Sequence, residues 1–165
     1  MALEDTSMEG TVRSLATGLL RFCVGHCEDP ASGEDIAQES LAALVARWRR
    51  LGPPDDPAAF TYTIARRRLW RWRVKRRLLA PLSILGEPAT PQSCDRALDA
   101  RRRLAGVRRV FARLTARERE ALLISLDGLS TSQAAAALGV KTSTFKMRLH
   151  RARRRLGTLL EESDA

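Results

Sequence analysis

The sequence has few of the residues on which catalysis and covalent cross-linking usually depend. Its 165 residues include three cysteines, two histidines and one tyrosine. An odd number of cysteines gives no disulfide framework and is typical of a reducing compartment, so we expect a cytoplasmic protein. Glycine-rich phosphate loops and hydrolase motifs are absent from the sequence, so we expect no cofactor, no catalytic residues and no enzymatic activity.

Long apolar runs and acidic residues are also scarce. No apolar stretch is long enough to cross a bilayer, and the polar, acidic residues 1–10 do not resemble a signal peptide, so we expect no membrane insertion. The 19 acidic residues are outnumbered by 29 Lys and Arg, which leaves a net charge of +10. Overall basicity alone would fit a generic basic protein, but eight of the twelve residues over 66–77 are Lys or Arg. This clustering indicates a polyanionic partner.

The segment over 114–156 has the pattern of a helix-turn-helix. Ser130 and Gln133 form a capping box that predicts the start of a short helix, and Gly139 is placed to end it with a positive φ. Thr115 and Glu118 form a second capping box upstream. The helix that this second box starts is expected to present three leucines for packing: Leu122, Leu123 and Leu126. Two short helices around a tight turn are typical of major-groove readers.

The second helix of this motif is amphipathic and basic. Thr142 or Ser143 is expected to cap it. Its apolar residues recur at helical spacing and predict a buried stripe of Phe145, Leu149, Ala152 and Leu156. The residues opposite this stripe, which are expected to face DNA, are Ser143, Lys146, Met147, His150, Arg151 and Arg154. A solvated terminal helix without a partner fits less well, because the caps, turn and stripe agree with one another.

The remaining pattern predicts an all-α protein of two small helical domains. Helices are expected over 11–27, 32–50 (capped by Ser32) and 58–77. Their expected core residues are Val12, Leu15, Leu19, Phe22, Ala37, Leu41, Leu44, Trp48, Leu51, Phe60 and Ile64, with Tyr62 as a further candidate. Pro and Gly residues over 78–98 predict a linker, and a further helix is expected over 99–114. We therefore divide the chain into a domain over 8–77, the linker, and a helix-turn-helix domain over 99–161.

Three potential metal ligands lie within five positions. Cys23, His26 and Cys27 could share an ion, but no fourth ligand is evident nearby, and they adjoin an apolar stripe. We favour buried structural residues and expect no metal site.

The run from Leu129 to Arg153 resembles the C-terminal DNA-binding region of bacterial RNA polymerase sigma factors. It is most similar to the extracytoplasmic-function (ECF) group of the sigma-70 family, whose pattern is Gly-Thr-Val-Lys-Ser-Arg-Leu-x-Arg-Ala-Arg. This chain departs from that pattern with Ser143, Phe145 and Met147 at the positions of the Gly, Val and Ser. In the family this region reads the −35 element of a promoter, so the resemblance assigns −35 DNA binding to Ser143, Thr144, Lys146, Met147, His150, Arg151 and Arg154. Met147 lies on the expected DNA face, so the family's promoter preference does not carry over there.

The first domain resembles the same family. Glu34-Asp35-Ile36-Ala37-Gln38-Glu39 matches an acidic signature that, in the family, docks on the clamp helices of the polymerase β′ subunit. The resemblance therefore assigns core RNA polymerase binding to Asp35, Gln38 and Glu39. The alternative explanation, carboxylates that stabilise a helix N-terminus, applies to Glu34 and Asp35 more than to the other two.

The segment over 58–77 corresponds to the family's −10 recognition and melting region. Its match is Phe60-x-Tyr62-x-Ile64-Ala65-Arg66. Guanidinium groups hold a DNA backbone while aromatic rings stack on unpaired bases, which assigns −10 DNA binding to Arg66, Arg67, Trp70, Arg71 and Arg73. Trp70 and Trp72, two apart on a helix, cannot both be buried. Arg67 and Arg71 depart from the Asn and Asp that the family often has nearby.

The resemblance implies a sigma factor that binds core RNA polymerase and promoter DNA and is held inactive by an anti-sigma factor. A promoter spacer of about 17 base pairs spans roughly 58 Å, and a linker over 78–98 can extend to about 70 Å, so two domains could reach two elements. Two alternatives remain open from the residues. One is a stand-alone helix-turn-helix regulator, and the other is a sigma-like decoy for an anti-sigma factor.

Overall fold

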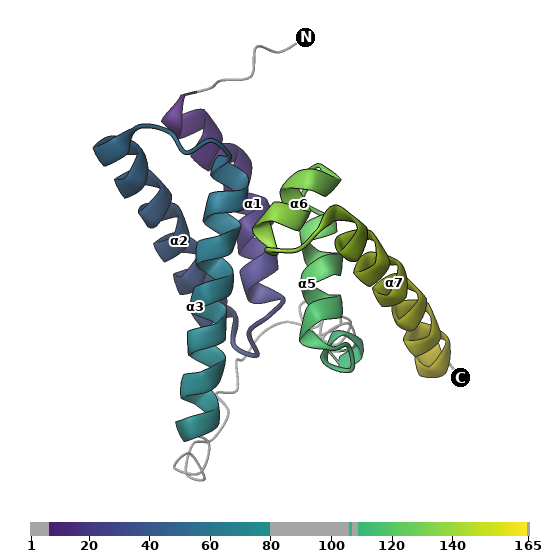
Figure 1. The fold of residues 1–165 in the computed structure, drawn as a ribbon. Helices are drawn as coiled ribbons and strands as arrows, with labels where there is room; N and C mark the ends of the chain where they lie inside the picture. Colours follow the sequence, from purple (N-terminus) through teal and green to yellow (C-terminus); the bar gives the residue numbers. More distant parts are fainter. Residues whose placement is uncertain (1–6, 80–105, 107–108, 165) are drawn as a thin grey trace, which may run out of the picture.

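A computed structural model describes residues 7–79, 106 and 109–164 of the chain. Every element in these ranges is a helix, as the sequence predicts. The helices are α1 (Met8–Val24), α2 (Pro30–Leu51), α3 (Pro57–Leu79), α5 (Ala116–Ser125), α6 (Thr131–Ala137) and α7 (Thr142–Asp164). Figure 1 shows α1, α2 and α3 as one bundle and α5, α6 and α7 as a second group beside it. No helix in the described ranges is long and apolar enough to span a bilayer.

The N-terminal bundle begins each of its first two helices with a side-chain cap. The Ser7 hydroxyl accepts a hydrogen bond from the Gly10 N–H at 3.0 Å, and Asp29 accepts from the N–H groups of Ala31 and Ser32. The prediction that Ser32 caps α2 was therefore wrong. Asp29 takes this role because Pro30, whose fixed φ suits the first position of a helix, follows it directly.

The buried face of α3 differs from the one expected. Tyr62 and Leu69 are buried, whereas Phe60 and Ile64, predicted as core, are only half-buried. The face has shifted because α3 packs against a second group of helices as well as against α1 and α2. Leu51, also predicted as core, is 60% exposed because it is the last residue of α2.

The helix-turn-helix forms largely as its sequence predicts. Both capping boxes are present, at Thr115 with Glu118 and at Ser130 with Gln133. Gly139 has a φ of 62°, which favours glycine at this turn. The cap of α7 was predicted at Thr142 or Ser143, one or two residues too late. The helix begins at Thr142, and the Lys141 carbonyl accepts its first helical bond from the Phe145 N–H.

The second group packs through the predicted stripe of α7 and through two of the three leucines expected on the preceding helix. Phe145 and Ala152 are buried, and Leu149 and Leu156 are half-buried. Of the three leucines expected for packing, Leu122 and Leu123 are buried, whereas Leu126 is 59% exposed, because it lies beyond the last residue of α5.

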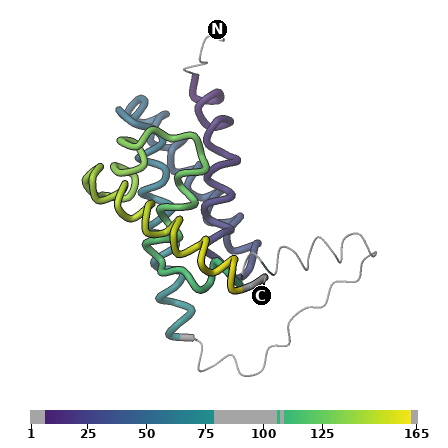
Figure 2. Tube along the Cα trace, turned by 90° about the vertical axis from the view of Figure 1, so that its right-hand side faces the viewer, coloured from purple at the N-terminus to yellow at the C-terminus, as the bar shows by residue number. Residues whose placement is uncertain are grey.

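The two groups of helices are docked on each other through a continuous apolar core. One cluster of buried residues runs from Leu19 and Phe22 in α1 to Ala135 in α6 and Phe145 in α7. Helices α3 and α6 make the most extensive contact between the groups. Figure 2 views the molecule from the side of the second group, with α7 crossing in front of the N-terminal bundle. The expected linker begins inside α3, at residues 78 and 79, and its other residues lie outside the described ranges. Of the helix expected over 99–114, residues 109–112 are helical, and residues 99–105 and 107–108 lie outside the description.

Candidate nucleic-acid interface

Helix α7 carries a continuous polar and basic face that no other described helix covers. All of the residues predicted to face the −35 element are exposed: Ser143, Thr144, Lys146, Met147, His150, Arg151 and Arg154. Met147, an apolar residue in the middle of this face, is 56% exposed. Because Phe145 and Ala152 fix the opposite side of the helix in the core, the basic face is held outward, where a major groove can reach it.

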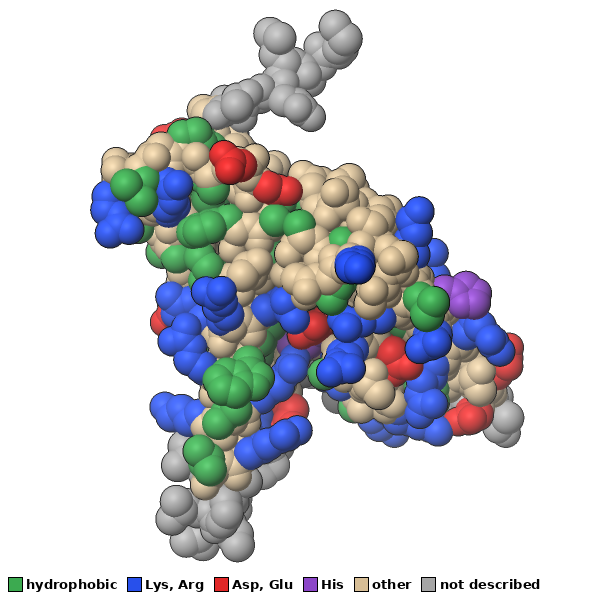
Figure 3. Space-filling view, in the orientation of Figure 1, with side chains coloured by type: hydrophobic (Ala, Val, Ile, Leu, Met, Phe, Trp, Pro, Cys, Tyr) green, Lys and Arg blue, Asp and Glu red, His purple; other side chains and the backbone are tan. Residues whose placement is uncertain are grey.

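Helix α3 divides the predicted −10 residues into two sets. Arg67, Trp70 and Arg71 are exposed, and the Trp70 side chain is 64% exposed. Arg66 and Arg73 are half-buried and turn toward the second group of helices. Lys and Arg side chains cluster over the C-terminal half of α3 and across the second group (Figure 3).

The two tryptophans of α3 differ in exposure, as expected for residues two apart on a helix. Trp70 is exposed, whereas Trp72 is half-buried, with the Arg76 guanidinium carbon 5.2 Å from the centre of its ring. This geometry is a cation–π contact, which holds Trp72 in place. Trp70 is left as an exposed flat ring beside Arg67 and Arg71, an arrangement suited to stacking on an unpaired base.

The acidic patch predicted for polymerase binding lies on the exposed side of α2. Asp35, Gln38 and Glu39 are all exposed. The Glu39 carboxylate forms an ion pair with Arg68 of α3, and the Glu39 side chain remains 59% exposed. A small negative patch on a strongly basic protein is complementary to a basic protein surface and repels a nucleic acid.

The contact between the two groups is centred on one buried carboxylate, Asp127, in the turn after α5. Its side chain is 2% exposed and accepts a bond of 2.8 Å from Arg21 of α1. The Tyr62 hydroxyl of α3 donates to its other oxygen at 2.7 Å. Burial raises the pKa of Asp127 above its usual value, although both hydrogen bonds oppose that rise. Burial and the bond to Asp127 likewise raise the pKa of Tyr62.

A second set of contacts joins α3 to the C-terminal end of α6. The Ala137 carbonyl accepts hydrogen bonds from Arg66 at 3.3 Å and from the Thr63 hydroxyl at 3.4 Å. Cations and donors are favourable at this negative end of a helix. Arg66 Nε also lies 3.5 Å from a Glu120 carboxylate oxygen. Sequence reasoning found neither set of contacts, because no local pattern pairs residues so far apart in the chain.

Cys23, His26 and Cys27 are buried at the end of α1, as predicted for structural residues. Burial raises the pKa of Cys23 to about 12 and that of Cys27 to about 11. Burial and, to a smaller extent, the charges of Arg73, Arg119 and Arg66 lower the pKa of His26 to about 3, although the hydrogen bond to the Phe22 carbonyl opposes the fall. In the described ranges, no three His, Cys, Asp or Glu side chains are grouped as metal ligands.

Comparison with known proteins matches both halves of the chain. The family model for sigma-70 region 2 matches residues 11–78, and the model for sigma-70 region 4 matches residues 104–156. The RNA polymerase sigma-E factor of Streptomyces antibioticus is 34% identical over 171 residues, covering 98% of this chain and 88% of the relative. The ECF RNA polymerase sigma factor SigL of Mycobacterium tuberculosis is 32% identical, with 98% and 93% covered.

A solved structure has a similar arrangement of helices. The sigma factor RpoE of Bartonella quintana, crystallised with the anti-sigma factor NepR, aligns with a TM-score of 0.67 at 26% identity. The alignment covers 93% of this chain and 96% of RpoE. The relatives therefore match the chain over nearly its whole length and not over the helix-turn-helix alone.

Proposed function

Because the chain belongs to the extracytoplasmic-function group of the sigma-70 family, we propose that it binds core RNA polymerase and directs initiation at specific promoters. The observation that carries this proposal is the presence of both sigma regions on one chain, each with its basic face exposed. An anti-sigma factor controls its activity, as the likeness to RpoE bound to NepR indicates. No covalent chemistry is assigned to this chain, because the polymerase performs the synthesis.

The second domain, over 99–161, reads the −35 element with the N-terminal half of α7. Lys146, Met147, His150 and Arg151 contact base edges in the major groove, and the flanking Ser143, Thr144 and Arg154 bind phosphates. The exposure of all seven side chains supports this role.

The first domain, over 8–77, holds the polymerase and the −10 strand on different faces. Asp35, Gln38 and Glu39 on α2 bind the β′ clamp helices. Arg67, Trp70 and Arg71 on α3 bind the melted −10 strand, joined by Arg66 and Arg73 once they are released from the second domain.

Promoter binding requires the two domains to separate. A spacer of about 17 base pairs separates the two promoter elements by roughly 58 Å. In the docked arrangement, α3 and α6 are in contact and α7 follows α6 after a short turn. We infer that the docked arrangement is the resting form, and that polymerase and promoter bind a form in which the linker is extended.

Transcription with purified core polymerase tests the proposal. The chain is expected to support initiation from its own promoter, and core polymerase alone is not. Asp35→Arg is expected to abolish polymerase binding, whereas Glu161→Arg, an equal charge reversal at an exposed position of α7, is expected to retain it. Unchanged initiation by a folded Asp35→Arg variant would reject the polymerase site. Promoter binding without any factor-dependent initiation would instead identify a stand-alone regulator.

A further inference from the structure

A cavity of about 950 Å³ lies between the two domains, away from the exposed faces of α2 and α7. The end of α1, the C-terminal half of α3 and the segment over 109–123 all contribute to its walls. Its size falls at the upper end of the range for small-molecule sites, about 300–1,000 Å³. Apolar side chains form part of the lining, among them Val24, Trp72, Phe111 and Leu123.

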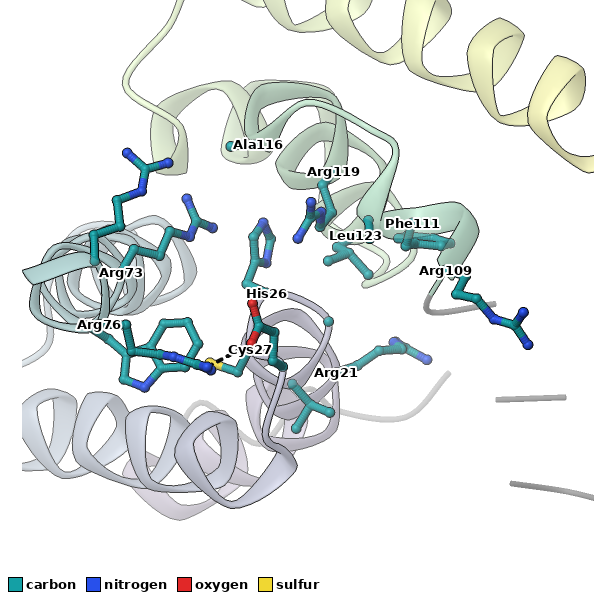
Figure 4. A pocket seen from close by; sticks show the side chains of 16 residues that line it. Arg21, His26, Cys27, Arg73, Arg76, Arg109, Phe111, Ala116, Arg119 and Leu123 are labelled. Atoms are coloured by element: carbon teal, nitrogen blue, oxygen red, sulfur yellow. Dashed lines mark ion pairs between the residues drawn. The ribbon is translucent and has the colours of Figure 1, made fainter. Parts of the chain in front are cut away.

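Three buried polar atoms among the lining residues have no hydrogen-bond partner in the described ranges, although other atoms of the His26 and Arg119 side chains are bonded: Arg119 Nη2 donates to the Leu114 carbonyl at 3.2 Å. His26 Nε2, Arg73 Nη2 and Arg119 Nε are buried, and each lacks a hydrogen-bond partner within the described part of the chain. His26 is 4% exposed, and Figure 4 shows its ring pointing into the space between Arg73 of α3 and Arg119 of α5. A buried polar atom without a partner has lost its hydrogen bonds to water and gained none in return, so three together indicate a place prepared for a polar ligand.

The charged side chains around the cavity indicate whether that ligand is a cation or an anion. Two of the other lining arginines are neutralised: Arg21 pairs with Asp127, and Arg76 pairs with Glu28. No carboxylate in the described ranges pairs with Arg73 or Arg119. Burial lowers the pKa of Arg119, and the positive charge of Arg73 contributes to the fall, because the two guanidinium groups repel each other. An anion between them would remove that repulsion.

The position of His26 favours a phosphoryl group over other anions. His26 Nδ1 lies 2.8 Å from the Phe22 carbonyl, and only a protonated Nδ1 can donate to that oxygen. Nε2 therefore has a lone pair directed at the cavity. A phosphate monoester has three terminal oxygens for three groups, and in its singly protonated form the P–OH can donate to the Nε2 lone pair while the other two oxygens accept from the guanidinium groups. A carboxylate has only two oxygens.

We propose that this cavity binds a small organic phosphate, with the phosphoryl group held by Arg73, Arg119 and His26 and the apolar body against Trp72 and Phe111. The ligand contacts both domains, so its binding stabilises the docked arrangement by mass action. The site is independent of the proposed transcriptional function, because ligand binding is measured without polymerase or DNA.

Isothermal titration calorimetry of the full-length chain at constant ionic strength tests the proposal, with phenyl phosphate as the probe. We expect a dissociation constant below a millimolar, at least tenfold weaker binding of benzoate, and weaker binding of inorganic phosphate, which lacks the apolar body. Arg119→Gln is expected to weaken phenyl phosphate binding at least tenfold. Arg155→Gln removes the same charge from an exposed position of α7 and is expected to change it less than twofold.

Each contrary result is decisive. Equal binding of benzoate and phenyl phosphate would overturn the phosphoryl assignment, and equal losses in Arg119→Gln and Arg155→Gln would reveal nonspecific attraction to a basic protein. No heat of binding up to several millimolar would reject the site. If Arg119→Gln does not fold, by circular dichroism, Arg73→Gln is the substitute. A rise in Tm with phenyl phosphate, present in wild type and absent in the arginine variant, is the second readout.

Discussion

The Tyr62 hydroxyl on α3 donates a hydrogen bond of 2.7 Å to the Asp127 carboxylate, 65 residues later in the chain. Arg21 of α1 binds the other carboxylate oxygen, so three separate segments meet at one buried charge. A buried carboxylate is stable only when its partners are in place, because it has lost its contact with water. Asp127 therefore makes the docking of the domains depend on a few specific atoms.

Removing the Tyr62 hydroxyl is expected to destabilise the protein. Tyr62→Phe keeps the buried ring but leaves one Asp127 oxygen without its donor, so the free energy of unfolding should fall by about 1–3 kcal/mol. Urea unfolding at neutral pH measures this change. Ser14→Ala removes an exposed hydroxyl bonded to the Thr11 carbonyl and is expected to cost less than about 0.5 kcal/mol. Equal losses in the two variants would contradict a special role for the Tyr62–Asp127 bond.

Two helical glycines should respond oppositely to the same substitution. A Cβ atom at Gly18 would lie 2.9 Å from both Asp127 Cγ and the Tyr62 hydroxyl, so Gly18→Ala forces the domains apart. We expect a loss of about 1–3 kcal/mol in the free energy of unfolding. Gly157 in α7 has nothing within 4 Å, and Gly157→Ala should gain about 0.5–1 kcal/mol from lower backbone entropy in the unfolded chain. Thermal unfolding measures both, and a stabilised Gly18→Ala would show that the domains are not tightly docked.

Acid should destabilise the protein through His26. Its pKa is about 3 in the folded chain and about 6.5 when exposed, so between these values the unfolded chain binds a proton that the folded chain does not. This contribution to stability is complete above about pH 6.5 and is lost as pH falls, at up to about 1.4 kcal/mol per unit.

The histidine prediction is checked by proton NMR. The His26 ring signals are expected to stay constant from pH 8 to pH 5, and a His150→Gln variant identifies them by removing the signals of the second histidine. A midpoint near pH 6.5 for His26 would mean that the cavity between the domains is open to water in solution.

Two substitutions on α7 should separate affinity from sequence preference. Arg151→Gln removes a cation, so affinity for promoter DNA should fall and the slope of log K against log salt should decrease by about 1. Met147→Ala removes no charge, so the slope should stay constant while the preferred −35 bases change. Fluorescence anisotropy on a panel of duplexes measures both. Arg13→Gln, an equal charge loss on the exposed side of α1, should leave binding almost unchanged; an equal effect there would refute the α7 assignment.

Local patterns predicted the local structure well. The capping boxes at Thr115 and Ser130 and the turn at Gly139 depend on residues three or four apart, and the structure confirms all three. The residues of α7 predicted to face outward are exposed for the same reason, since one amphipathic helix determines its own two faces.

The errors concern contacts that a local pattern does not contain. Phe60 and Ile64 were predicted as the core of α3, with Tyr62 only as a further candidate. Tyr62 is the fully buried one, because α3 also packs against the other domain, where Asp127 accepts its hydrogen bond. The burial of Arg66 and Arg73 depends on the same docking. Sequence periodicity shows that a helix has an apolar side, but it does not show how many neighbours the helix will have.

Arg66 holds the two domains together and is also one of the residues proposed to bind the −10 strand. When the domains are docked, its guanidinium is bound to the Ala137 carbonyl and lies beside Glu120. If Arg66 also binds the melted strand, DNA and the second domain compete for the same guanidinium group. By thermodynamic linkage, binding of the melted strand to Arg66 then shifts the equilibrium from the docked to the undocked arrangement of the domains.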